Sequence, residues 1–380
     1  METKKYRFDE VTINFDKKRI PLSSAQREKR QGTFRYYGAQ GVIDHVDDYI
    51  YDGTYLLIAE DGENLKSKKQ NIAQVVDGQF WVNNHAHIVQ GNEQCDTRFL
   101  CYLINSMDLS GYVTGSAQPK LSQANLNAIT LSLPTLVEQK RIVEYLYMLD
   151  QKIDVNRQIN DNLEQQAQSY FQELFVDNAD PEWAIGTISD LGTVVGGSTP
   201  SKAKPEYYTE SGIAWITPKD LSINKSKFVS HGENDITEHG LKNSSAAIMP
   251  EGTVLFSSRA PIGYIAIAAG EVTTNQGFKS VVPKPEIGTP FVYFFLKNTL
   301  PVIEGMASGS TFKEVSGSTM KNVPAVIPDA ETLAKFSDFC APIFAQQRIL
   351  EEQNQSLATL RDNLLPKLMS GEIDVSAVQL

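Results

Sequence analysis

The fold is decided by the stretch VEQKRIVEYLYMLDQKIDVNRQINDNLEQQAQSYFQELF, which runs from Val137 to Phe175. Its apolar residues recur at alternating spacings of four and three, the heptad pattern of a helix that packs along one stripe against another helix. Adding 194 to each residue number finds the same pattern near the end of the chain, again with polar residues in its middle. The sequence therefore predicts two long helices of matching phase. The residues predicted for the seam of this helix pair are Ile142, Leu146, Leu149, Ile153, Asn160, Leu163, Ile343, Leu350, Asn354, Leu357 and Leu364.

The repeat extends upstream of both helices. Gly111–Ser116 aligns with Gly305–Ser310 at the same offset, and Leu133-Pro134 aligns with Ile327-Pro328. A fixed offset over this length indicates that a whole unit, one globular domain followed by one long helix, is duplicated. We therefore expect an α+β fold in which two globular α/β domains are separated by two long antiparallel helices with pseudo-two-fold symmetry. The expected boundaries are 1–136 for the first domain, 137–177 for the first helix, 178–329 for the second domain and 330–372 for the second helix with its tail.

An apolar seam of about 38 helical residues, roughly 57 Å long, has to be covered. The other copy is the obvious partner, because the chain must return to build the second helix, and polar seam residues can fix the register of such a pair. Two alternatives are that the helices lie in separate cores or pair with another chain. Pro342 and Pro366 both fall within the second heptad pattern, so the second helix is expected to be kinked or shortened.

Length and composition describe an ordinary globular protein. The chain has 380 residues, enough for two or three domains. We find no run of 18 apolar residues and no charged-then-apolar start, so neither a membrane span nor a signal peptide is expected. The three cysteines are too few for a disulfide framework and lack metal-ligand spacing, which favours a cytoplasmic location.

The net charge of −11 is unevenly distributed. Residues 1–136 carry 15 Lys and Arg against 16 Asp and Glu, and residues 181–330 carry 12 against 14. Residues 137–180 carry 4 against 9, and residues 331–380 carry 4 against 7. The domains are thus nearly neutral and the helical segments are acidic. An acidic helical segment suits a protein partner better than a phosphate backbone.

Candidate nucleic-acid contacts occur in both domains. In the first, an expected loop combines Arg35, Tyr36, Tyr37 and Gln40 with two glycines, and Lys120 lies in the repeated motif. Such side chains can stack on bases or form paired hydrogen bonds with them, although tyrosines beside a turn can equally belong to the core. In the second domain, polar and cationic residues follow expected strands and turns, where the alternative is an ordinary surface position. These second-domain candidates are Ser198, Thr199, Lys202, Lys219, Arg259 and Lys313.

No site for a metal or a phosphate group is expected. His85 and His87 form an HxH pair, but no carboxylate or cysteine stands at ligand spacing nearby. The glycines around Gly196 and Gly197 fit neither a phosphate-binding loop nor a dinucleotide fingerprint. We also find no Asn-Pro-Pro-Tyr or Asp-Pro-Pro-Tyr tetrapeptide for amino-methyl transfer and no nuclease cluster. The chain is therefore expected to be non-catalytic.

The order of motifs within the repeat resembles the specificity subunit of bacterial type I restriction-modification systems over essentially the whole chain. Single motifs are only moderately specific, but their order is highly so. The motifs that carry the resemblance are Tyr36–Asp44, Tyr55–Gly62, Trp215–Leu221, Ser257–Gly263, Asn275–Phe278 and Leu364–Ile373. One departure is that Gly-Ser-Thr-Pro at 197–200 has no counterpart in the first domain, so contact residues are not transferred between the halves.

The resemblance implies a function and partners. Each globular unit would be a target recognition domain that reads one half of a split double-stranded DNA target. The helices would set the gap and dock two methyltransferase subunits, and the restriction/translocase subunits, which combine nuclease and translocase, would join the complex. S-adenosylmethionine, ATP and magnesium would then belong to partner subunits, with no cofactor on this chain. The alternative is a non-enzymatic scaffold that uses its duplicated domains to bind protein or glycan.

Overall fold

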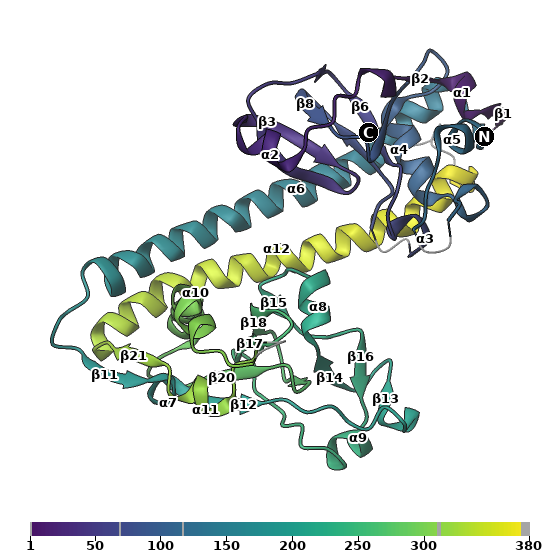
Figure 1. Cartoon of the computed structure of the whole chain (residues 1–380). Helices are drawn as coiled ribbons and strands as arrows, with labels where there is room; N and C mark the ends of the chain where they lie inside the picture. The colour runs from purple at the N-terminus through teal and green to yellow at the C-terminus, as the bar shows by residue number, and fades with distance from the viewer. Residues whose placement is uncertain (1, 68–69, 116–117, 310–312, 374–380) are drawn as a thin grey trace. The chain divides into compact units, whose positions relative to one another are not determined.

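The computed structural model describes residues 2–67, 70–115, 118–309 and 313–373 and divides into two compact units (Figure 1). Unit 1 comprises Met1–Ile153 and Ser356–Leu380, and unit 2 comprises Asp154–Gln355. Each unit therefore contains one globular domain together with a segment of both long helices. These unit boundaries fall within the helices, because each domain packs on its own stretch of the helix pair.

Unit 1 contains two four-stranded sheets and a two-stranded ribbon. The strand orders are β2-β9-β6-β7, β4-β3-β8-β5 and β1-β10. The elements of the domain are β1 (Lys4–Arg7), α1 (Phe8–Val11), β2 (Thr12–Asn14), α2 (Ser24–Glu28), β3 (Gln31–Gly38), β4 (Gly41–Val46), β5 (Tyr51–Asp52), β6 (Tyr55–Ala59), α3 (Asn64–Ser67), β7 (Ala73–Val76), β8 (Gln79–Val82), β9 (Ala86–Gly91), α4 (Thr97–Ser106), α5 (Gln123–Asn127) and β10 (Thr130–Leu133).

Unit 2 repeats this plan with a larger central sheet. Its strand orders are β12-β20-β17-β18-β15, β13-β16-β14-β19 and β11-β21. The elements are β11 (Ala184–Thr187), α7 (Ile188–Leu191), β12 (Gly192–Gly196), β13 (Tyr208–Thr209), β14 (Ile213–Ile216), α8 (Pro218–Ile223), β15 (Phe228–Val229), β16 (Asn234–Ile236), α9 (Glu238–Lys242), β17 (Val254–Ser258), β18 (Ile262–Ala268), β19 (Thr273–Thr274), β20 (Lys279–Pro283), α10 (Thr289–Gly305), α11 (Gly317–Lys321) and β21 (Pro324–Ile327).

The duplication appears in the strand register. In unit 1 the ribbon pairs Lys4 with Leu133, and in unit 2 the equivalent ribbon pairs Ala184 with Ile327, antiparallel in both. The helical turn, the strand and the start of the long helix that follow keep the 194-residue offset, as α5, β10 and α6 in unit 1 and α11, β21 and α12 in unit 2. The predicted duplication is thus confirmed. Ser116 and Ser310, which end the aligned motif, lie outside the described residues.

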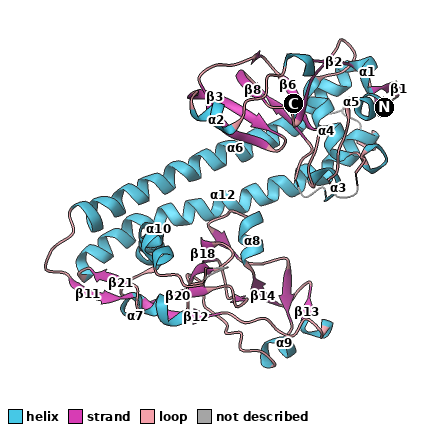
Figure 2. Cartoon of the chain, viewed as in Figure 1, coloured by secondary structure: helices cyan, strands magenta, loops and turns pink. Residues whose placement is uncertain are grey.

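The two long helices are α6 (Leu136–Gln172), followed by a π-helical turn at Glu173–Asp177, and α12 (Ala330–Ser370). Figure 2 shows α12 as a continuous helix, so the prediction that prolines shorten it is wrong. Pro342 and Pro366 are both exposed, whereas Ile343 and Leu368 beside them are buried. Packing of the buried neighbours compensates for the backbone hydrogen bond that each proline cannot donate.

Within each unit the helix segments run antiparallel. In unit 2, Asn156 Nδ2 donates to Asn354 Oδ1 over 2.9 Å, and Gln347 Nε2 donates to the backbone oxygen of Asn160 over 3.1 Å. In unit 1, Arg361 donates to Asp150 over 2.7 Å. Residue numbers thus rise along α6 as they fall along α12, as the intramolecular pairing required.

The predicted seam is buried to different degrees. Five of the eleven predicted residues are buried in the pair and the domain cores, and the other six are partly exposed. The buried ones are Ile142, Leu146, Ile153, Ile343 and Leu350, and Asn160, Leu149, Leu163, Asn354, Leu357 and Leu364 are intermediate. Asn156, which the seam pattern includes in polar form, is fully buried.

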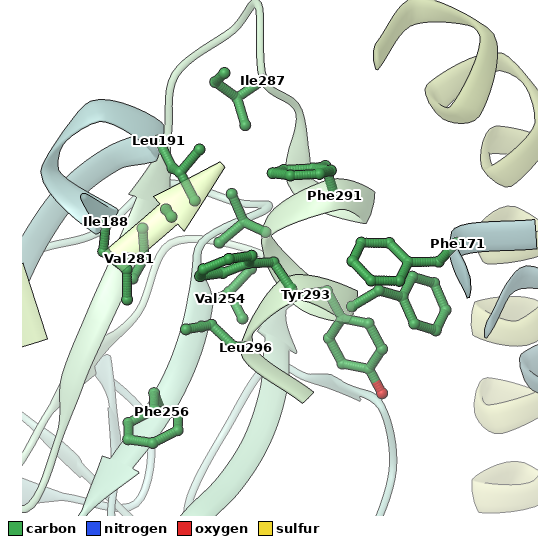
Figure 3. Close-up of a cluster of buried hydrophobic side chains, with 14 of the residues drawn as sticks. Phe171, Ile188, Leu191, Val254, Phe256, Val281, Ile287, Phe291, Tyr293 and Leu296 are labelled. Carbon is green, nitrogen blue, oxygen red and sulfur yellow. The ribbon is translucent and has the colours of Figure 1, made fainter. Parts of the chain in front are cut away.

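The helix segments belong to the domain cores. In unit 2, Phe171 of α6 points at the aromatic face of α10, where Phe291 and Tyr293 lie (Figure 3). The Phe171 ring centroid is 5.8 Å from that of Phe291 and 5.8 Å from that of Phe336 on α12. In unit 1, Ile142 belongs to one core with residues of α4. Burial of this apolar area is what holds each domain on its helix segments.

No helix in the described part of the chain has the length and apolar composition needed to cross a membrane.

Candidate nucleic-acid interface

In unit 2 the loop after β12 lies against the segment before β20. The backbone nitrogen of Ser198 donates to the backbone oxygen of Thr274 over 2.9 Å, and the indole of Trp215 donates to the backbone oxygen of Ser198 over 3.0 Å. The Thr199 hydroxyl hydrogen-bonds to the side-chain oxygen of Gln276. These contacts place two predicted residues beside a glutamine from a different part of the chain.

Three cations of unit 2 are each close to a carboxylate. Lys219, in the first turn of α8, pairs with Glu233, and this hydrogen bond raises the pKa of Lys219. The Glu314 carboxylate lies 3.5 Å from the Arg259 guanidinium and 3.7 Å from Lys279 Nζ. These acid–base pairs hold the cations in place and offer both donors and acceptors.

Lys279 connects the two groups. Its Nζ donates to the backbone oxygen of Gln276 over 3.4 Å, so the loop after β12 and the Arg259 turn belong to one face. Lys202 and Lys313 are exposed on the flanking segments. We call this set the domain 2 face. Its members are Ser198, Thr199, Lys202, Lys219, Arg259, Gln276, Lys279, Lys313 and Glu314.

Unit 1 has a comparable face around Lys120, which pairs with Glu60 over 3.3 Å. Glu60 also accepts from Arg19 over 3.0 Å, and Arg19 donates to the backbone oxygen of Ala86 over 2.9 Å. Burial acts to raise the pKa of Glu60, but hydrogen bonds from Arg19 and Lys120 outweigh it and the pKa is lowered. Glu60 therefore stays ionised between two cations.

Gln40 lies at the edge of the same face. It is exposed in the turn between β3 and β4, and its Nε2 is 3.5 Å from where a Cβ on Gly62 would stand. Gly62 in turn donates to the backbone oxygen of Pro119, the residue before Lys120. We call Arg19, Gln40, Glu60 and Lys120 the domain 1 face.

The repeat makes Lys120 and Glu314 equivalent positions. Each forms a β-bridge across its own hairpin, Thr114 with Lys120 and Ser308 with Glu314. The charges are inverted between the copies, since Lys120 pairs with Glu60 and Glu314 pairs with Arg259. Two faces of one architecture thus present different chemical groups, which suits two readers of different sequences.

The structure contradicts direct contact by the two predicted tyrosines. Tyr36 is 0% exposed with its hydroxyl bonded to the backbone nitrogen of Leu22, and Tyr37 is 5% exposed. Rings this deeply buried offer no face to a base, so the core alternative holds for both. Arg35 is partly buried and donates to the backbone oxygen of Asp77 over 2.6 Å, which turns it toward the β7–β8 connection.

The two histidines have separate structural partners. His87 is buried between Asp16, at 2.6 Å, and the backbone oxygen of Leu121, at 2.8 Å. His85 is exposed and lies 2.7 Å from Asp61. Across the described ranges no three His, Cys, Asp or Glu side chains gather as metal ligands would.

Comparison with known proteins assigns the chain to a family. The sequence model of the type I restriction modification DNA specificity domain matches residues 2–165 and again 181–360, once for each domain with its helix. The chain belongs to this family. The match confirms the resemblance drawn from the motifs and does not favour a scaffold for protein or glycan.

Relatives and a solved structure agree with this family. The chain is 39% identical over 191 residues to the type I restriction enzyme MjaIX specificity subunit of Methanocaldococcus jannaschii, covering 48% of this chain and 44% of that protein. It is 24% identical to the HindI specificity subunit of Haemophilus influenzae, covering 85% and 84%. The S subunit structure from M. genitalium aligns with a TM-score of 0.58 at 16% identity over 97% and 96% of the chains, which supports the fold.

Several residues of the domain 1 and domain 2 faces were not predicted from the sequence. Gln276 and Lys279 lie within or beside the motif Asn275–Phe278 that carried the resemblance, which was a usable signal. Arg19 belongs to a charged turn, Asp16–Arg19, but nothing local links that turn to Lys120. Only the folded sheet brings these distant segments together.

Proposed function

We propose that this chain gives a type I restriction-modification complex its DNA sequence specificity, with each globular domain reading one half of a split double-stranded target. The observation that carries the proposal is the pair of units built on one duplicated plan, each exposing a face of paired acidic and basic side chains. Two readers on a helical spacer recognise a bipartite site because each contributes base contacts while the spacer fixes their separation.

The chemistry of the faces suits reading of base edges. An arginine such as Arg259 can pair with guanine, a glutamine such as Gln276 with adenine, and a glutamate such as Glu314 can accept from cytosine. Each good contact contributes roughly 1–3 kcal/mol of discrimination. Because both domains are nearly neutral, we expect much of the phosphate binding to come from partner subunits.

The helix pair would dock those partners. Its segments are acidic, with 4 Lys and Arg against 9 Asp and Glu in residues 137–180 and 4 against 7 in residues 331–380, which favours a protein surface of opposite charge. We propose two methyltransferase subunits there, joined by restriction/translocase subunits. The chain itself would be non-catalytic and cytoplasmic, and S-adenosylmethionine, ATP and magnesium would be bound by the partners.

A matched insertion tests the spacer role. Seven residues would be added to α6 after Ile153 and seven to α12 after Gln355, so that the heptad pattern stays in phase in both helices. The added length is about 10.5 Å, or about three base pairs at 3.4 Å each. Methylation mapping of the complex should show both half-sequences unchanged and a gap longer by about three base pairs. An unchanged gap would refute the role.

A domain exchange tests the reading role. Replacing residues 178–329 with the corresponding segment of another family member should change one half-sequence and leave the other and the gap in place. If both half-sequences changed, or neither did, the assignment of one half-site to each domain would be wrong.

A further inference from the structure

A buried lysine joins the second domain to its helix segments. Lys227 directly precedes β15, the edge strand of the central sheet, and is 8% exposed. Its Nζ lies 2.8 Å from a carboxylate oxygen of Glu164 on α6 and donates to the side-chain oxygen of Gln347 on α12 over 2.9 Å. One cation of the domain is therefore bound by both helices at once.

Aromatic rings enclose the same cation. Lys227 Nζ is 3.5 Å from the ring centroid of Phe344 on α12, and 4.5 Å and 5.2 Å from those of Tyr293 and Phe294 on α10. Burial lowers the pKa of Lys227 to about 8. The Tyr293 hydroxyl, at the edge of the core cluster in Figure 3, also lies 3.1 Å from Glu164. The cation thus has few alternative positions.

Backbone contacts reinforce the junction one turn further along α12. The Glu351 carboxylate accepts from the backbone nitrogen of Lys227 over 2.8 Å and from that of Phe228 over 3.0 Å. Arg348 donates to the backbone oxygen of Ala269, which follows the neighbouring strand β18. Two adjacent strands of the central sheet are therefore attached to one face of α12.

Stability alone does not explain such a junction. Taking a lysine and a glutamate out of water costs several kcal/mol, and well-packed apolar residues of similar volume are often as stabilising. Directional charge-assisted hydrogen bonds do define an angle, which apolar contacts alone define less well. The aromatic core around Phe171 already supplies the apolar attachment.

We propose that Lys227 and Glu164 are positioning residues that fix the angle of the second domain on the helix pair and thereby set the gap that the subunit tolerates between its two half-sequences. The inference rests on the proposed DNA-reading function. Neither residue belongs to the domain 2 face, so their effect on DNA is indirect.

Unit 1 is attached differently. There the α6 carboxylate is Asp150, which binds the hydroxyl of Tyr102 on α4 and the guanidinium of Arg361 on α12. The Asp150 and Arg361 side chains are each 29% exposed, whereas the Lys227 side chain is 7% exposed. A change at Lys227 should therefore alter one domain's angle and leave the other domain's attachment intact.

The test uses the full chain in its methyltransferase complex and a DNA library in which the gap varies. Lys227→Met keeps the aliphatic stem and removes the charge, and Lys227→Arg restores a cation. The matched control is Lys242→Met, which removes the exposed pair with Glu238 on α9. We expect Lys227→Met to raise the ratio of methylation at gaps one base pair longer or shorter to methylation at the native gap by about tenfold over the wild type. The half-sequences should be unchanged.

Other outcomes separate the possibilities. If Lys227→Met unfolds the domain, Glu164→Gln takes its place, because this variant keeps the hydrogen bond and removes the charge. It should likewise widen the range of gap lengths that are methylated. A folded variant with the wild-type gap distribution, or broadening that Lys242→Met shares, overturns the inference. Absence of half-sequence preference in the wild type as well would instead overturn the proposed function.

Discussion

Replacing the polar pair in the helix seam should stabilise the protein, although replacing one member should destabilise it. Asn156 is fully buried and donates to Asn354 over 2.9 Å, while its own side-chain oxygen has no hydrogen-bond partner within the described chain. An unsatisfied buried acceptor costs roughly 1–3 kcal/mol, and burying a leucine in its place contributes roughly 1.5–3 kcal/mol. Against the lost hydrogen bond of about 1 kcal/mol, we expect the double variant Asn156→Leu, Asn354→Leu to gain about 2 kcal/mol.

The single variant Asn354→Leu has the opposite sign. It leaves the Asn156 amide with only the 3.5 Å contact to Gln353, so the free energy of unfolding should fall by about 1 kcal/mol. Urea titration followed by far-ultraviolet circular dichroism measures both changes, provided the m value is unchanged. The account would be refuted if the two single variants lost equal stability and the double variant lost the sum of both. That result would show that the two amides gain more from each other than their burial costs.

Three further predictions concern the domains. The Asp16–His87 pair should give unit 1 a pH optimum: burial opposes ionisation of both, but their mutual hydrogen bond lowers the pKa of Asp16 below 3.8 and raises that of His87 above 6.5. The contribution of the pair to the free energy of unfolding should therefore be full between pH 3.8 and 6.5. It should be lost as pH rises through the His87 pKa or falls through the Asp16 pKa. Asp16→Asn should lose about 2 kcal/mol of stability, and its thermal melts should lack this pH dependence. Arg259→Met should relax base preference at one position of one half-sequence, costing roughly 1–3 kcal/mol there in binding assays on single-base variants. Lys202→Met should instead weaken binding to all sequences alike and reduce the slope of log K against log salt by about one.

The architecture could be predicted from the sequence because it depends on two periodic features, the heptad spacing and the internal repeat. The heptad spacing from Ile142 onward and the constant offset to the second copy are long-range regularities that local packing does not blur. The prediction that Pro342 and Pro366 shorten the second helix was wrong because the helix-breaking effect of proline is that of an isolated helix. In α12 buried neighbours such as Ile343 and Leu368 hold the helix in place. Tertiary packing outweighed a local preference there.

The faces were harder to predict for a physical reason. Tyr36 and Arg19 carry no local mark of burial or exposure. Each owes its position to a distant segment, since Tyr36 pairs with Trp81 in β8 and Arg19 donates to the backbone oxygen of Ala86. Aromatic residues beside glycines satisfy both a base-stacking and a core pattern, and only the sheet decides between them. Lys227 was invisible for the same reason, since its partners Glu164 and Gln347 lie 63 and 120 residues away.

The polar seam also bears on which helices pair. The repeat makes Leu350 of α12 the equivalent of Asn156 of α6, so the register of Asn156 with Asn354 would become Leu350 with Asn354 if two copies of α12 paired with each other. Both copies of Asn354, which is partly buried in the pair, would then face a leucine and lose the amide partner, at a cost of roughly 1 kcal/mol each. Pairing α6 with α12 satisfies them, as single polar seam residues do when they select partner and register. The departure of the second seam from the first at this position therefore favours pairing of α12 with α6 over pairing of two copies of α12 from two chains.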